Sequence, residues 1–270
     1  MAKLIREHFN SISEMLSVIC SRPNNYVMKG QECSRTGDED FTGTKSWNEA
    51  MNLYQYGYTE VLEEIKKGTT AVTGTLAPVQ RNKIVNDVIG YAPHVPNAIL
   101  GLPNSMIGMK KVPQKVKTVS IVYKMTANAR EHKETFTKAG IALLSAINML
   151  ELSGIRVSLK LCFECAKADN EFSFATVKLK DYSEHLDIQK LCFPVAHPSM
   201  FRRFGFKWLE TCEGMEDTSW RCGYGRSLHE KSEVPEEMKA QIKENEYFIF
   251  LQEIKKWNYD PRKIIEEIKK

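Results

Sequence analysis

The chain has 270 residues, of which 42% are hydrophobic and 27% are charged, a balance that excludes wholesale disorder. Its 38 Lys and Arg residues against 34 Asp and Glu residues leave a formal net charge of +4. That excess is too small to indicate nucleic-acid binding by itself.

Targeting and cysteine patterns both favour a cytoplasmic location. No apolar run approaches the roughly 18 to 20 residues needed to span a bilayer. Glu7 and His8 stand where a signal peptide would need its apolar segment. The seven cysteines are odd in number and dispersed, which is typical of reduced thiols.

Residues 1–83 are predicted to form an N-terminal helical region. Apolar residues recur at helical spacing from Leu4 to Ile19 and predict an amphipathic helix over 4–20. A polar loop is expected over 30–44. A second helix is predicted to begin at Ser46, because Glu49 can reach back to the cap amide, with an interruption at Gly57.

Residues 84–115 have a different character and are predicted to form a proline-rich wrap. Prolines at 93, 96, 103 and 113 remove backbone donors and fix φ, which disfavours a long helix or a central strand. The segment also carries Ile99, Leu100, Met106 and Ile107. These side chains would be exposed, and available to a partner, if they fail to pack on the rest of the chain.

Residues 116–270 are predicted to form an α/β domain. The β-branched run 116–123 predicts a strand, 135–152 a helix with one apolar stripe, and 155–161 a second strand. Together they form a β-α-β unit with parallel pairing and a right-handed crossover. A short turn then makes the strand at 172–179 antiparallel to the second strand, and we place it at an edge of the sheet.

The remaining elements complete the expected mixed sheet flanked by helices. Residues 187–212 are predicted to be helical and bent by Pro194 and Pro198, and 235–244 to be a short charged helix. The apolar run 247–251 is typical of a buried parallel strand. Asp260 and Pro261 predict the start of a final helix.

This order of elements resembles the von Willebrand A-type, Rossmann-like fold. Three stretches are also similar to a family of phage and plasmid proteins with no established activity: Phe41–Trp47; Gly90, Pro93, Val95, Pro96, Leu100 and Gly101; and His197–Arg203. The similarity covers about residues 40 to 270. The resemblance implies a phage or mobile-element source.

The metal site of the von Willebrand A fold is expected to be absent here. In that fold a D-x-S-x-S motif at the end of the first strand holds the metal, and the matching position reads Lys124, Met125, Thr126, Ala127, Asn128. An ammonium group opposes cation binding. Lys124, Thr126 and Asn128 could instead bind an anion at the strand end, but we favour a solvent-facing lysine without a ligand.

Other catalytic constellations are missing, so we expect no metal and no cofactor. Cys162 and Cys165 have C-x-x-C spacing without a second pair, and residues three apart on a strand point to opposite faces. No phosphate loop, dinucleotide-binding turn or nucleophile elbow occurs. His197, Arg202 and Arg203 could bind a phosphate or a partner's carboxylate. The favoured alternative has one arginine paired inside the domain and the other facing solvent.

We therefore predict a non-enzymatic phage or mobile-element protein that binds a host or phage protein and antagonises a host process, including host defence. The first alternative is a nucleic-acid-binding protein that uses Lys110, Lys111, Lys117, Arg202 and Arg203. The second is an enzyme with an unrecognised site near Lys124, Thr126 and Asn128. The oligomeric state is left open.

Overall fold

The computed structural model describes residues 3–25, 32–70, 82–111, 117–168, 171–213, 226–243 and 245–269. The chain divides into two compact units. One comprises Met1–Leu76 and Thr118–Lys270, and the other comprises Ala77–Lys117. We refer to these as the main unit and the small unit.

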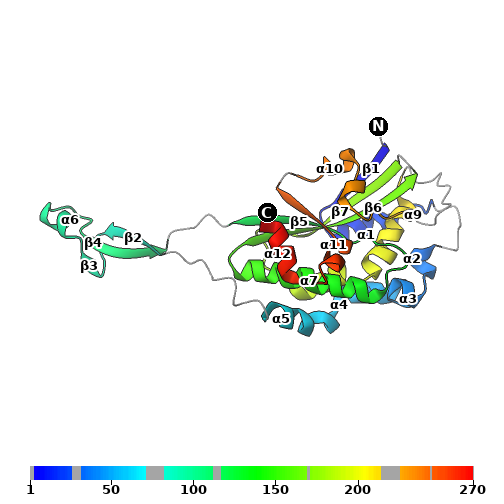
Figure 1. Ribbon diagram of the computed structural model, residues 1–270, viewed down its shortest axis with the longest axis horizontal. Helices are drawn as coiled ribbons and strands as arrows, with labels where there is room; N and C mark the ends of the chain where they lie inside the picture. The colour runs from blue at the N-terminus through cyan, green and yellow to red at the C-terminus, as the bar shows by residue number, and fades with distance from the viewer. Residues whose placement is uncertain are drawn as a thin grey trace. The chain divides into compact units, whose positions relative to one another are not determined.

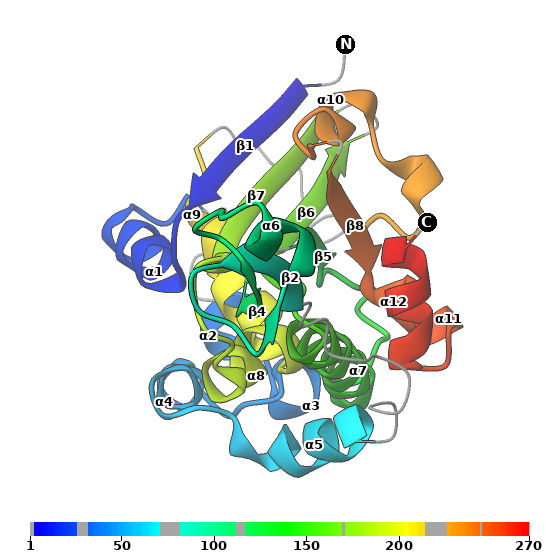
Figure 2. The ribbon, with the colours of Figure 1, turned by 90° about the vertical axis from the view of Figure 1, so that its left-hand side faces the viewer.

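A five-stranded mixed sheet organises the main unit (Figures 1 and 2). Its strands are β1 (Lys3–Phe9), β5 (Thr118–Lys124), β6 (Arg156–Ala168), β7 (Glu171–Lys180) and β8 (Glu246–Phe250). Their order is β1-β7-β6-β5-β8, with β6 and β7 antiparallel and every other neighbouring pair parallel. The predicted α/β class, with a mixed sheet flanked by helices, is confirmed.

None of the helices that the structure describes is both long and apolar enough to cross a membrane.

The helices of the main unit follow the predicted order closely from α7 onward. The helical elements are α1 (Ile12–Ser21), α2 (Cys33–Thr36), α3 (Glu39–Thr42), α4 (Trp47–Tyr56), η1 (Thr59–Val61), α5 (Leu62–Thr70), α7 (Lys133–Leu152), α8 (Ile188–Ala196), the π-helical turn η3 (Met200–Gly205), α9 (Phe206–Thr211), η4 (Lys231–Glu233), α10 (Glu236–Lys239), α11 (Leu251–Lys256) and α12 (Pro261–Lys269).

The two faces of the sheet carry different cores, because successive side chains of a strand point to opposite sides. Leu161, Phe163 and Cys165 of β6 join the large apolar cluster with most of the helices. Cys162 belongs to a smaller cluster on the opposite face, where Met238 of α10 also packs. In Figure 1, α10 lies above the sheet and α7, α11 and α12 lie below it. The two cysteines thus face opposite sides, as predicted.

The N-terminus and the sheet edge differ from the prediction. Residues 3–9 form strand β1, which pairs in parallel with β7, and a helix follows only from Ile12. Strand β7 is therefore second from the edge, and β1 is the edge strand. Ile5 and Phe9 are four residues apart and would share one face of either a helix or a strand, and the backbone groups of β7 that β1 pairs favour the extended form.

Helix α7 crosses the large cluster and lies unusually close to α8. Gly140 makes this approach possible, since a Cβ atom there would lie 2.4 Å from the Cα of Ala196. Such a distance is far inside van der Waals contact. The predicted bend over 187–212 is seen as three consecutive helical segments, α8, η3 and α9, with Pro194 inside α8.

The small unit is a three-stranded antiparallel sheet with one short helix. Its elements are β2 (Asn82–Asp87), β3 (Ala92–Pro93), α6 (Val95–Ile99) and β4 (Met106–Lys111), in the strand order β2-β4-β3. Gly90 lies against Ile107, whose carbonyl oxygen would be 2.2 Å from an added Cβ. Pro93 ends strand β3 and Pro96 lies in the first turn of α6, where we had expected irregular backbone.

Candidate functional site

The carboxyl end of β5 holds a buried ion pair. Lys124 Nζ lies 2.9 Å from Glu164 Oε1, and both side chains are fully buried. The ammonium also donates to the carbonyl oxygens of Thr126 and Leu228 and to Ser227 Oγ, and it lies 4.8 Å from the Phe250 ring centroid. Lys124 is thus neither solvent-facing, as we favoured, nor available to an external anion.

Thr126 and Asn128 have different environments at this strand end. Thr126 is buried and donates from Oγ1 to Glu164 Oε1 at 2.6 Å, so it completes the ion-pair network. Asn128 is exposed and accepts at Oδ1 from the Arg130 amide. Within the described ranges, no group of three or more His, Cys, Asp or Glu residues could hold a metal ion.

Arg202 is buried between aromatic rings and backbone carbonyls. Its guanidinium lies 4.1 Å from the Phe41 ring centroid and 4.7 Å from that of Phe136. It donates to the carbonyl oxygens of Phe41, Asn128 and Glu131. Burial lowers its pKa to about 10, which still leaves it charged at neutral pH. Arg202 therefore connects α3 to the loop after β5.

Arg203 is also buried, and all of its nitrogens donate within the main unit. Nε donates to Thr44 Oγ1 at 2.6 Å, and Nη1 to the Ser34 carbonyl at 3.0 Å. Nη2 donates to the Gly37 carbonyl and to Thr42 Oγ1. We expected one paired and one exposed arginine, whereas both lie inside the fold. Neither is placed to bind phosphate or carboxylate on another molecule.

His197 completes this interior cluster. Its ring is 1% exposed, stacks on Phe193 and meets Tyr58 edge-on. Nδ1 accepts from the Ser199 amide. Burial, with contributions from Lys133 and Arg203, lowers the pKa of His197 to about 3. The ring is therefore neutral in the folded protein at physiological pH and has a packing role.

The pKa of His197 predicts an acid-dependent loss of stability. Its folded pKa of about 3 is below the ordinary value of 6.5, so the unfolded chain binds an extra proton between these values. As the pH falls through that window, His197 should therefore lower the free energy of unfolding by about 1.4 kcal/mol for each pH unit. Urea titrations between pH 7 and pH 4 give the free energy of unfolding of the wild type and of His197→Gln at each pH. The wild type should show the steeper dependence on pH. Parallel curves would contradict the prediction.

Lys110 and Lys111 lie on β4 of the small unit. In the antiparallel register Lys110 faces Lys83 and Lys111 faces Asn82. Three lysines therefore gather at one end of the β2–β4 ladder, while no Lys, Arg, Asp or Glu occurs from Val88 to Met109. The small unit thus combines a basic strand end with an uncharged segment from Val88 to Met109.

The same unit carries most of the exposed apolar surface. None of the side chains described from Ile84 to Met109 is buried. Ile99 and Leu100 are 80% and 73% exposed, as expected for side chains that fail to pack, whereas Met106 and Ile107 are half-buried. The large apolar residues exposed in this unit are Ile84, Val88, Ile89, Tyr91, Val95, Ile99, Leu100, Leu102 and Met109. Elsewhere in the described chain only Tyr56 and Leu152 are comparable.

Our interpretation of the sequence missed Ile84, Val88, Ile89 and Tyr91 as candidate contact residues. A signal was present, because the segment 88–109 is uncharged but too short and too rich in glycine and proline to bury its own apolar residues. In this segment we had singled out Ile99, Leu100, Met106 and Ile107 and left open whether they pack.

Comparison with protein families gives one assignment. The profile described as "Domain of unknown function (DUF7192)" matches residues 2–270. Comparison with curated proteins and with solved structures gives no match. Because the matched region includes both the main unit and the small unit, the chain belongs as a whole to the DUF7192 family.

Proposed function

We propose that the chain is a non-enzymatic interaction protein that binds a partner protein through the small unit. The proposal depends on the exposure of nine large apolar side chains in the small unit, where no side chain described from Ile84 to Met109 is buried. Exposed apolar residues concentrated in one part of a protein mark interaction sites. Burial of such residues supplies most of the favourable free energy of association.

The partner that would complement this surface of the small unit is a protein with an apolar groove bordered by acidic residues. Lys83, Lys110 and Lys111 gather at one end of the β2–β4 ladder, and acidic groups on the partner would complement them. The small unit of a second copy would offer these lysines Asp87 as the one acidic residue of the segment 82–111. Strand β2 is an edge strand, whose unpaired backbone groups suit strand addition by a protein and disfavour insertion into lipid.

A phage or mobile-element source, a cytoplasmic location in the host and antagonism of a host process are part of this proposal. They rest on the resemblance of three sequence stretches to phage and plasmid proteins. The order of elements supports a von Willebrand A-like scaffold: β5 is central, β6 and the antiparallel β7 lie on one side, and β8 lies on the other. Lys124 and its bound Glu164 occupy the strand end where that fold holds metal.

Substitution of the small unit tests the proposal. Ile89→Asp/Ile99→Asp should weaken partner binding at least tenfold, because both side chains are highly exposed and a buried carboxylate is costly. Tyr56→Asp, an equally exposed apolar position in the main unit, is the matched control. Partners captured from bacterial lysate by the wild-type chain are purified. Their affinities for all three proteins are then measured by calorimetry.

Two other outcomes would overturn the proposal. Sedimentation that shows self-association of wild type, abolished in the double variant, would assign the surface to a second copy. Flotation with phosphatidylcholine–phosphatidylserine vesicles, lost in the double variant, would assign it to a membrane surface. A purified partner bound equally by wild type and the double variant would also contradict it.

A further inference from the structure

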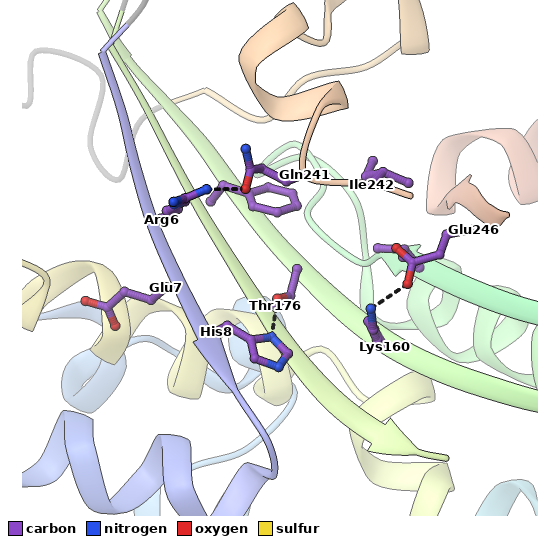
Figure 3. Close-up of a pocket in the computed structure, with 10 residues that line it drawn as sticks. Arg6, Glu7, His8, Lys160, Thr176, Gln241, Ile242 and Glu246 are labelled. Atoms are coloured by element: carbon purple, nitrogen blue, oxygen red, sulfur yellow. Dashed lines mark hydrogen bonds and ion pairs between the residues drawn. The ribbon is translucent and has the colours of Figure 1, made fainter. Parts of the chain in front are cut away.

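A cavity of about 320 Å³ opens on the sheet face opposite most of the helices (Figure 3). Its lining residues come from the five strands of the sheet and from the segment before β8. Arg6 and His8 lie on β1, Thr176 on β7, Lys160 on β6 and Glu246 on β8. Val122 and Phe174, which are 1% and 3% exposed, add an apolar floor.

Basic groups outnumber acidic groups at this cavity. Lys160 stands directly opposite Lys178 in the β6–β7 register, an arrangement of like charges that destabilises a sheet. Both lysines also act on His8, whose pKa is lowered by burial and by these two neighbours. A bound anion would relieve this repulsion.

The acidic residues near the cavity are already engaged. Glu246 is 5% exposed, holds Lys160 Nζ at 2.5 Å and also accepts from Ser120 Oγ. Glu7 is counted among the lining residues, but Figure 3 shows its carboxylate pointing away from the others, and it binds Arg22. Asp181 pairs with Lys178 at 3.7 Å.

Donors remain available on three of the basic side chains. Arg6 uses one guanidinium nitrogen on Gln241, and Lys160 uses one of its three N–H groups on Glu246. His8 contacts Thr176 Oγ1 through Nδ1 at 2.8 Å. Nε2 of that ring has no partner among the described residues. Figure 3 shows Arg6, His8 and Lys160 around the same hollow.

We propose that this cavity binds the phosphate group of a small phosphorylated organic molecule, with Arg6, His8 and Lys160 as its donors. Two cationic donors, Arg6 and Lys160, together with an imidazole N–H of His8, suit a dianionic phosphate monoester better than a single carboxylate. The apolar floor of Val122 and Phe174 suits a compact organic group beside the phosphate, and the volume is within the range of small-molecule sites. The proposal is independent of the small unit.

Calorimetry on the full chain tests this site with AMP, ribose 5-phosphate and inorganic phosphate as probes, and with adenosine as the uncharged control. AMP should bind and adenosine should not. Arg6→Met and Lys160→Met should each weaken AMP binding at least tenfold. Lys138→Met is the matched control, because Lys138 is also paired with a glutamate but lies on α7.

The probes separate the sources of the phosphate group. Equal affinities for inorganic phosphate and AMP would show that the site recognises the phosphate group alone. Tighter binding of AMP would show that the site also contacts the organic group. Either result supports the proposed site. Arg6 is exposed, so Arg6→Met is expected to fold even if Lys160→Met does not. Absence of binding by all three phosphorylated probes at millimolar concentration would overturn the proposal. So would affinities unchanged in Arg6→Met.

Discussion

Replacement of Glu164 with alanine is expected to lower the free energy of unfolding by about 3–5 kcal/mol. The substitution leaves the Lys124 ammonium without its buried carboxylate partner, which lies 2.9 Å away in the wild type. It also removes the acceptor of Thr126 Oγ1 and of the Leu228 amide. Urea unfolding followed by circular dichroism at pH 7 measures the loss.

A double variant separates the cost of an unpaired charge from the cost of lost packing. Lys124→Met/Glu164→Leu removes both charges and should recover most of the stability lost in Glu164→Ala. The exposed pair Glu134–Lys138 on α7 is the control, and Glu134→Ala should change the free energy of unfolding by less than about 0.5 kcal/mol. A Glu164→Ala variant as stable as the wild type would refute the assignment of this pair as an essential buried network.

Arg203→Lys is expected to destabilise the main unit by about 3 kcal/mol, although it conserves the charge. A lysine has one nitrogen and cannot reach the Ser34 and Gly37 carbonyls and the Thr44 hydroxyl together. The segment 32–44 should lose its anchor before the sheet unfolds. Limited proteolysis should therefore cut this segment earlier in the variant, and thermal unfolding should report the lower stability.

Arg35→Lys is the matched control for this prediction. Arg35 lies on α2 in the same segment, but its side chain is exposed. Its replacement should leave both the cleavage pattern and the midpoint of unfolding unchanged. Equal protease sensitivity of Arg203→Lys and Arg35→Lys would show that Arg203 does not anchor the segment.

The sequence predicted the elements whose patterns are strong and local. The β-branched run after Val116, the apolar stripe of α7 and the apolar run of β8 are confirmed as β5 (Thr118–Lys124), α7 and β8. Capping chemistry was equally informative: Ser46 caps α4 by accepting from the Glu49 amide, and Pro261 begins α12. The Glu49 carboxylate, however, accepts from the Lys45 amide and not from the amide of Ser46 as predicted. Such signals depend on residues a few positions apart, which a sequence displays directly.

The roles of the candidate site residues depend on distant parts of the chain and could not be predicted in this way. Lys124 is buried because Glu164 lies on the neighbouring strand and the Leu228 carbonyl lies within reach. Arg203 is buried because carbonyls from Ser34 and Gly37 converge on it. A polar side chain is predicted from sequence to be exposed unless its long-range partners are known.

The α/β class and most of the elements from residue 116 onward were thus determined by periodicity and capping. Tertiary structure decided which charges are buried, that residues 3–9 form an edge strand on β7, and that the apolar residues of 84–109 find no cover within their own unit. The physical reason is that hydrogen bonds and ion pairs between distant segments stabilise conformations that local propensity leaves open.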